Sequence, residues 1–120
     1  MIEIIPNWHP IWVHFAVALL CTSVFLFLIF GWRSSQTNSQ THALIVARWT
    51  LRLGVVAEIG ALLTGYLASC SVALDDVSHA NMMVHRNWAF AATSIFAIIA
   101  LIDLMKRNEA RISLISILLL

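Results

Sequence analysis

Two histidines at the mouths of apolar segments are the residues best suited to do chemistry in this sequence. His14 precedes the apolar run 15–30, which only Thr22 and Ser23 interrupt, and His85 opens a later apolar run. A histidine in a membrane helix is costly unless it pairs with or binds something, and neutral imidazole is a common metal ligand. A b-type haem needs axial ligands and no covalent attachment. The pattern therefore predicts haem b, with His14 and His85 as the axial ligands of the iron.

Other residues near the same depth could complete such a site. Gly65 lies near the end of the middle apolar segment, where a missing side chain leaves room for a porphyrin face. Arg86 follows His85 and is placed to meet the haem propionates, as are Asn87, Trp8 and His9. The alternative is that these histidines only hydrogen-bond loop backbone and lipid headgroups, as interfacial tryptophans do.

Other metals have weaker support in the sequence. His9 and His79 suit loop or capping positions, although a second metal could use them. A copper or zinc site could combine histidines with the sulfur of Met82, Met83 or Cys70, since soft sulfur with imidazole suits copper, but no tight ligand spacing supports it. No Cys-x-x-Cys-His motif is present, which excludes a c-type haem attachment.

Glu58 is a carboxylate in the middle of an apolar segment, where an ionised side chain is expensive. Membrane carboxylates of this kind serve proton or quinone chemistry. The alternative is a protonated side chain that faces a partner or hydrogen-bonds a hydroxyl at similar depth, from Thr22, Ser23, Thr93 or Ser94. We expect Arg52 to extend toward the membrane surface instead of pairing with Glu58.

The composition is that of an integral membrane protein. Of the 120 residues, 61% are hydrophobic and 11% are charged, whereas a soluble domain has about 25% charged residues. The net charge of +1 gives no basic patch for a nucleic acid. No catalytic nucleophile or triad is visible, so an electron-transfer subunit is favoured over a stand-alone enzyme.

The apolar pattern predicts a single all-α transmembrane domain that resembles a four-helix bundle. We expect helices at about 10–32, 44–69 and 81–105, then a charged turn over 106–111 and a partial fourth helix at 112–120. The nine residues of this last segment cannot cross a bilayer, because a span needs about 20. Either the last helix is clipped or a half-helix docks against a partner. Small residues at spacings of four, Ala57, Ala61 and Gly65, predict a close helix contact.

The charged loops predict the orientation of the helices. Basic residues gather after the first and third segments, at Arg33, Arg48, Lys106, Arg107 and Arg111, and acids predominate at the other end. The positive-inside rule then places the N-terminus outside the cell. Tryptophans at helix ends predict aromatic belts, with Trp8, Trp12 and Trp88 outside and Trp32 and Trp49 inside. We expect the bacterial inner (cytoplasmic) membrane, with the first segment retained and not cleaved as a signal peptide.

Three motifs together resemble a bacterial membrane family, the domain of unknown function 2231. They are His9-Pro10-x-x-Val13-His14-Phe15, then Leu63-Thr64-Gly65-Tyr66, then His85-Arg86. The resemblance covers about residues 5–105 and implies a four-helix membrane bundle with a place in electron transfer, since some members are fused to cytochrome c or Rieske-type domains. It implies haem ligation at His14 and His85. Ala16 stands where the family pattern has proline.

The sequence therefore predicts a membrane electron-transfer subunit with haem b near the outer face. Expected partners are membrane lipid, other membrane subunits or an external electron carrier, with quinone as a further candidate. The alternative is a cofactor-free structural or assembly subunit of a larger respiratory or photosynthetic membrane complex. Copurification of a fixed partner without haem would select that alternative.

Overall fold

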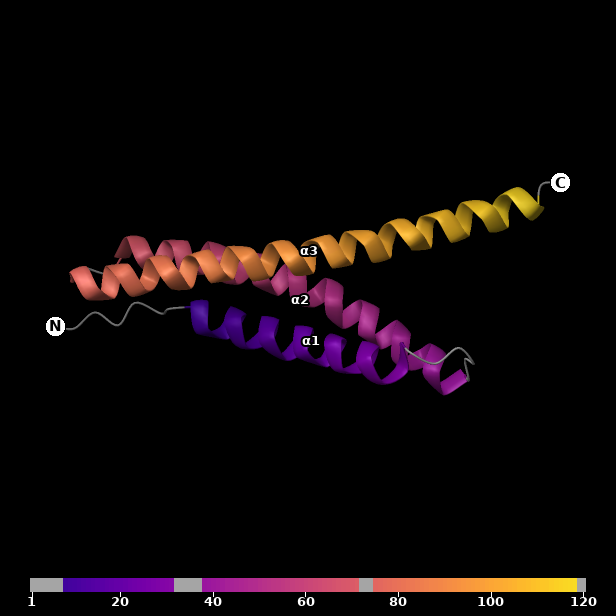
Figure 1. The fold of residues 1–120 in the computed structure, drawn as a ribbon, viewed down its shortest axis with the longest axis horizontal. Helices are drawn as coiled ribbons and strands as arrows, with labels where there is room; N and C mark the ends of the chain where they lie inside the picture. The colour runs from indigo at the N-terminus through magenta and orange to yellow at the C-terminus, as the bar shows by residue number, and fades with distance from the viewer. Residues whose placement is uncertain (1–7, 32–37, 72–74, 119–120) are drawn as a thin grey trace.

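Three long helices make up the described part of the chain. The computed structural model describes residues 8–31, 38–71 and 75–118, and of residues 108–118 only the backbone. Within these ranges lie α1 (His9–Phe30), α2 (Asn38–Ser71) and α3 (Asp76–Leu118), without strands (Figure 1). All three helices are long and apolar enough to cross a membrane. The predicted all-helical fold is therefore confirmed.

Local sequence signals explain where the helices begin and end. Pro10 occupies the first turn of α1, where its missing N–H leaves no hydrogen bond unmade. At the other end, the N–H of Gly31 donates to the Phe27 carbonyl at 2.8 Å. Asp75 caps α3, because its Oδ1 accepts the backbone N–H of Ser78 at 3.0 Å. This cap starts α3 at residue 76, earlier than the predicted 81, and α2 likewise starts at 38 instead of 44.

The predicted turn at 106–111 and the separate fourth helix at 112–120 are not observed. Instead, α3 is a single helix of 43 residues that continues through 106–111 to Leu118. That segment contains no glycine or proline, and Lys, Arg, Glu and Ala are all good helix formers. The charged residues 106–111 indicate that the helix leaves the apolar part of the membrane there. A helix can pass from lipid into water without ending. Figure 1 shows this end of α3 extending past the other two helices.

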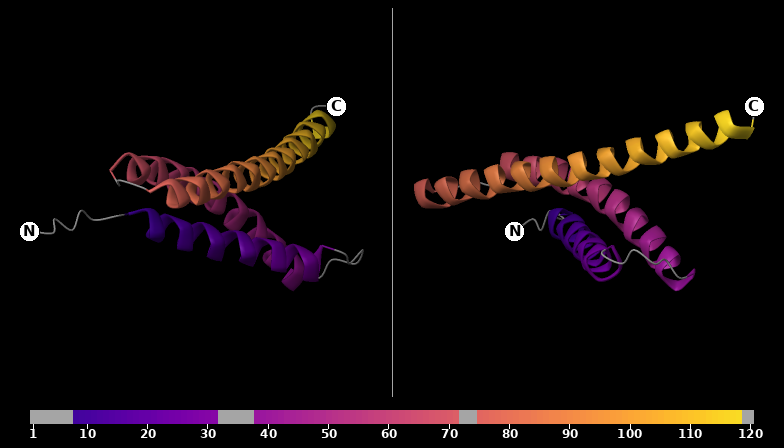
Figure 2. Two further views of the ribbon diagram at one scale, coloured as in Figure 1. Left: turned by 60° about the vertical axis from the view of Figure 1, so that its left-hand side comes forward. Right: turned by 45° about the vertical axis from the view of Figure 1, so that its right-hand side comes forward.

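The main packing is between α1 and α2, which run antiparallel side by side (Figure 2). One seam of α1 faces α2, with Ala16, Leu20 and Ser23 buried. A Cβ added to Gly54 would come within 2.6 Å of Leu20, so this glycine allows close approach. The Ser23 hydroxyl donates to the Ala47 carbonyl at 2.8 Å across the same contact. Of the small residues predicted to allow a close contact, Ala57 and Ala61 are buried, and Gly54 adds a further point of close approach to α1.

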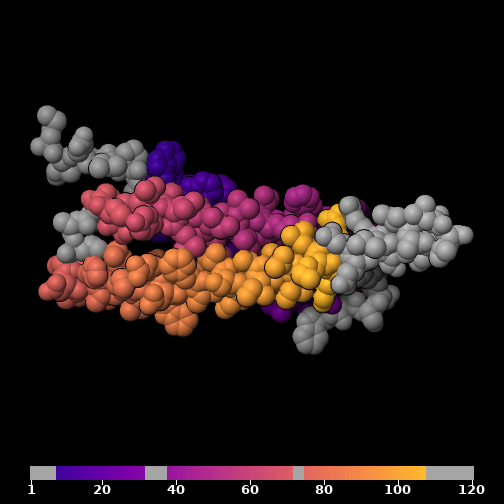
Figure 3. All heavy atoms as spheres, turned by 90° about the horizontal axis from the view of Figure 1, so that it is seen from above, coloured from indigo at the N-terminus to yellow at the C-terminus, as the bar shows by residue number. Residues whose placement is uncertain are grey.

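The third helix packs on α2 and crosses it at an angle (Figures 1 and 2). Figure 3, seen from above, also shows α2 and α3 alongside each other. Among the described residues, α1 and α3 make no close backbone contact, so α2 forms the floor of a space between them. Both α1 and α3 begin at the same end of the molecule, and α3 begins further out (Figure 1), so that the first turn of α1 lies opposite the third turn of α3.

Several residues used to predict the orientation lie outside the described residues or side chains. They are Trp32, Arg33 and Arg111. Trp8, Trp12 and Trp88 lie toward the end where α1 and α3 begin, and Trp49 lies toward the other end of α2. The assignment of these two ends to the outside and inside of a cell stays a prediction.

Candidate functional site

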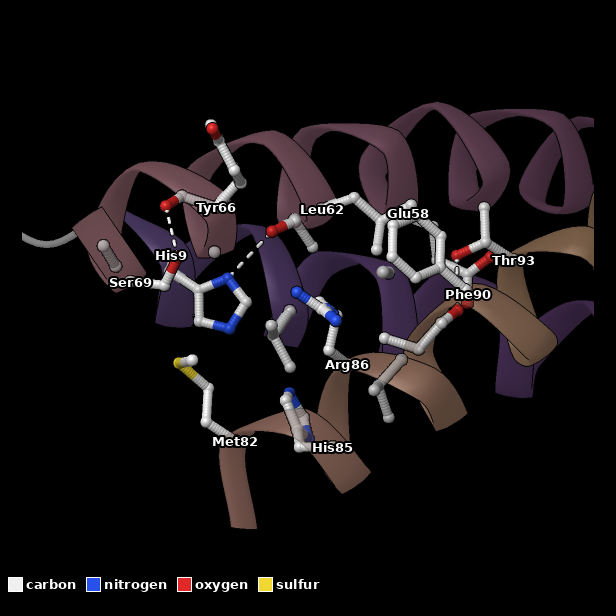
Figure 4. A pocket seen from close by; sticks show the side chains of 17 residues that line it. His9, Glu58, Leu62, Tyr66, Ser69, Met82, His85, Arg86, Phe90 and Thr93 are labelled. Carbon is white, nitrogen blue, oxygen red and sulfur yellow. Dashed lines mark hydrogen bonds between the residues drawn. The ribbon is translucent and has the colours of Figure 1, made fainter. Parts of the chain in front are cut away.

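A cavity of about 400 Å³ lies between the first turns of α1, the second half of α2 and the first half of α3. Its volume falls in the range of small-molecule sites, about 300–1,000 Å³. Its walls are mostly apolar, and a few polar side chains also line it: His9, Glu58, Tyr66, Ser69, His85, Arg86 and Thr93. Figure 4 shows this site with the labelled side chains around the opening. It is therefore a place where the described residues could hold a ligand.

His9 supplies one wall of the cavity from the first turn of α1. Its Nδ1 lies 2.9 Å from the Ala61 carbonyl oxygen on α2, and a carbonyl can only accept. The bond therefore requires a proton on Nδ1, and in the neutral ring Nε2 then carries the lone pair. The Thr64 hydroxyl also donates to the Ala61 carbonyl, at 3.2 Å. Figure 4 shows the His9 ring held by this bond, with its other nitrogen directed toward His85.

His85 faces His9 from the opposite wall on α3. The centroids of the two rings are 6.4 Å apart, and the ring planes are nearly perpendicular at 87°. A metal–imidazole nitrogen bond is about 2 Å long. Two imidazoles on opposite sides of one metal ion therefore have ring centres about 6 Å apart. The observed separation matches that requirement.

His14, the other predicted ligand, is not part of this arrangement. Its side chain is exposed, does not line the cavity, and its Nδ1 hydrogen-bonds the Pro10 carbonyl of its own helix. His14 is five positions after His9, so its side chain is turned by about 140° around the helix axis relative to that of His9. Val13, four residues after His9, shares its face and lines the cavity. The structure therefore brings His85 together with His9 and not with His14.

The other predicted cofactor-binding residues, Gly65 and Arg86, both line the cavity. A Cβ on Gly65 would lie 2.9 Å from Cε1 of His9, so the glycine makes room for the His9 ring itself. The Arg86 side chain is exposed and reaches into the opening beside the two histidines (Figure 4). Its charge is thus available to an anionic group at the rim.

The side chains considered for a copper or zinc site are mostly elsewhere. Met82 lines the cavity, with its sulfur on the His9 side in Figure 4, but Met83 does not line it. Cys70 is exposed near the end of α2, and His79 is exposed on α3. No group of three or more His, Cys, Asp or Glu side chains able to hold a metal occurs in the described part of the chain. Within the described part of the chain, the His9–His85 pair offers two candidate ligands that face each other.

Glu58 lines the end of the cavity that is farther from the two histidines, beside Thr93 of α3 (Figure 4). Its Oε2 is buried and has no hydrogen-bond partner among the described residues. The hydroxyls of Thr22 and Ser23 bond backbone carbonyls instead, as does that of Ser94. The Thr93 hydroxyl likewise donates to a backbone carbonyl, that of Ala89 at 2.9 Å, but of the four predicted partners it is the one that lines the cavity together with Glu58.

Comparison with known proteins adds no family to this description. No protein-family model matches the chain, and neither a curated protein nor a solved structure matches it. The resemblance to the domain of unknown function 2231 therefore stays a prediction.

Proposed function

We propose that this protein is a membrane electron-transfer subunit that holds haem b between His9 and His85. The observation that carries the proposal is the pair of imidazoles, which face each other across the space between α1 and α3 at 6.4 Å. The proposal keeps the predicted cofactor and replaces one predicted ligand, His14, with His9.

The hydrogen bond to His9 supports this role. Histidines that bind metals nearly always donate their second ring N–H to a carbonyl or carboxylate, which fixes the tautomer and the ring orientation. The bond from Nδ1 of His9 to the Ala61 carbonyl has this form and aims Nε2 at the cavity. His14 makes a bond of the same form to the Pro10 carbonyl, so the difference is one of position: His9 lines the cavity opposite His85, and His14 does not.

The surroundings of the pair also fit a flat, largely apolar cofactor. The cavity between α1 and α3 is lined with small or apolar side chains, which include Ala16, Ala61 and Phe90. Arg86 at the rim offers a guanidinium to carboxylates such as haem propionates. Bound haem would supply one-electron transfer, and this chain would set its potential through the two ligands, the apolar burial and the carbonyl bond to His9.

The test is a reduced-minus-oxidised visible spectrum of the purified protein, with a pyridine haemochromogen assay for the haem content. We expect low-spin b-type bands at about one haem per chain. His9→Ala and His85→Ala should each lose these bands. His14→Ala is the matched control, because His14 belongs to the same helix but points away, and it should keep the spectrum.

Two spectroscopic results would reject the proposal. One is a protein that is folded in a native-like membrane and has no haem after expression with sufficient haem supply. The other is loss of haem in His14→Ala with retention in His9→Ala, which would restore the ligand pair predicted from the sequence. Copper found in place of haem, by metal analysis of the purified protein, would also contradict it.

A second candidate function, a cofactor-free subunit of a larger membrane complex, is favoured by the sparse packing of α3. Of its described side chains only Ala100 is buried, and large apolar residues such as Ile95, Ile98 and Leu101 are exposed. A stable partner purified together with haem-free protein would favour this function. A haem-containing protein without a fixed partner would exclude it.

A further inference from the structure

A second cluster of polar groups lies at the opposite end of the α2–α3 contact from the histidines. Arg48 and Arg52 of α2 both bind Asp103 of α3. The distances are 2.9 Å from Arg48 Nε to Oδ1 and 2.8 Å from Arg52 Nη2 to Oδ2. Two guanidinium groups therefore share one carboxylate, which leaves an excess positive charge.

Each guanidinium in this cluster uses only one nitrogen for Asp103. The two Nη atoms of Arg48 have no hydrogen bond to any described residue, and 45% of its side chain is exposed. Arg52 Nε is buried and also lacks a partner among the described residues. A guanidinium has five N–H donors in a planar fork that matches carboxylate and phosphate oxygens. The cluster thus retains donors suited to a second anion.

Two further basic side chains extend the cluster along α3. Lys106 and Arg107 follow Asp103 by three and four residues, which places them on the same face of the helix, one turn further on. Both are exposed. Asp103 is thus one acidic group among four basic ones in the described side chains of this region.

The cluster lies where the shared apolar part of α2 and α3 ends. In α2 the largely apolar stretch 53–70 begins directly after Arg52, and at 1.5 Å per residue it covers about 26 Å, close to the hydrocarbon thickness of a bilayer. Trp49 is exposed at this level, and the Arg52 guanidinium lies 5.7 Å from its ring centroid. Exposed tryptophan is typical of the membrane–water interface. On α2 and α3 the cluster therefore lies at the boundary of their shared apolar stretch, whereas the apolar helix α1 continues past this level from Ser23, which contacts Ala47, to Phe30.

We propose that Arg48, Lys106 and Arg107, with Arg52 behind them, form a binding site for the phosphate of an anionic lipid headgroup. By the positive-inside prediction this lipid belongs to the cytoplasmic leaflet, where basic pockets between helices bind such headgroups. Asp103 orients the two arginines and keeps the excess charge toward the lipid. The proposal is independent of haem, because none of these residues lines the histidine cavity.

The test is lipid binding to the purified full chain by native mass spectrometry, with phosphatidylglycerol against phosphatidylcholine as probes. Each basic residue near a membrane surface contributes about 1 kcal/mol of attraction to anionic lipid, which is about fivefold in affinity. We expect Arg48→Gln and Lys106→Gln each to reduce phosphatidylglycerol retention about fivefold, without an effect on phosphatidylcholine. Both residues are exposed, so these variants should fold. Lys106→Arg, which keeps the positive charge at the same exposed position, is the matched control and should retain the lipid.

Three outcomes would overturn the proposal. The first is equal retention of the two lipids by the unchanged protein. The second is displacement of phosphatidylglycerol by millimolar inorganic phosphate, which would make the cluster a site for the free anion. The third is an acidic residue of a second copy crosslinked to the cluster, which would make it an interface between chains.

Discussion

Replacing Asp103 by asparagine should weaken the α2–α3 contact more than any other single polar change in the described residues. The substitution keeps the size of the side chain and removes the charge that Arg48 and Arg52 share. Both arginines would then lack an acidic partner among the described side chains. We expect the loss of stability to come chiefly from Arg52, because it is the more buried of the two.

Side-chain exposure sets the expected size of the effect. Arg48 is 45% exposed, so its pair with Asp103 should contribute at most about 1 kcal/mol. Arg52 and Asp103 are each only 18% exposed. Removing one partner of a fully buried pair costs about 3–5 kcal/mol, and partial exposure reduces this to about 2–3 kcal/mol. We therefore expect a loss of about 2–4 kcal/mol for Asp103→Asn and of less than about 1 kcal/mol for Arg48→Gln.

The assay is reversible unfolding in mixed micelles of mild detergent and dodecyl sulfate, followed by circular dichroism. The double variant Arg52→Gln/Asp103→Asn, compared with each of its two single variants, completes a double-mutant cycle. The cycle isolates the coupling energy between the two side chains. A coupling below about 0.5 kcal/mol, or equal effects of Arg48→Gln and Asp103→Asn, would refute the reasoning, because the ion pair would then behave as solvent-screened.

Three further predictions concern other parts of the chain. Gly65→Ala should displace the His9 ring, which a Cβ would approach to 2.9 Å, and so reduce the haem content per chain in the visible spectrum; an unchanged haem content would show that the ring has room to move. Ser23→Ala should cost about 0.6–1.7 kcal/mol in the same unfolding assay, since it removes a buried hydrogen bond to Ala47 across the α1–α2 contact; no measurable loss would contradict this. Hydrogen bonds at the start of α3 hold the pKa of Asp75 below its ordinary value, so its stabilising effect should be complete above the unfolded-state pKa and disappear as the pH falls through the lower folded-state pKa. An NMR titration of the first turn of α3 should show this change in the unmodified protein and not in Asp75→Asn, and a midpoint at or above the ordinary value would contradict it.

The helical class, the membrane-spanning length of three segments and the close approach along α2 could be predicted from the sequence. These properties depend on composition and local periodicity, because a bilayer span requires about 20 apolar residues and a close helix contact requires small ones. The spacing also contained a signal that was missed. His9, Val13, Ala16, Leu20 and Ser23 repeat at alternating intervals of four and three, which places them on one face, and His14 lies off that face.

Only the tertiary structure decided which polar groups meet. The choice of His9 over His14 opposite His85 depends on the rotation of α1 against α2, which the packing of Leu20 on Gly54 fixes. The partner of Arg52 is Asp103, in a segment that the sequence suggested was close to a turn, because α3 stays helical through its charges and remains beside α2. Helix rotation and pairing between distant segments arise from contacts summed over whole interfaces. Local sequence does not contain that information, and for this reason the class of the protein could be predicted while the geometry of its candidate site could not.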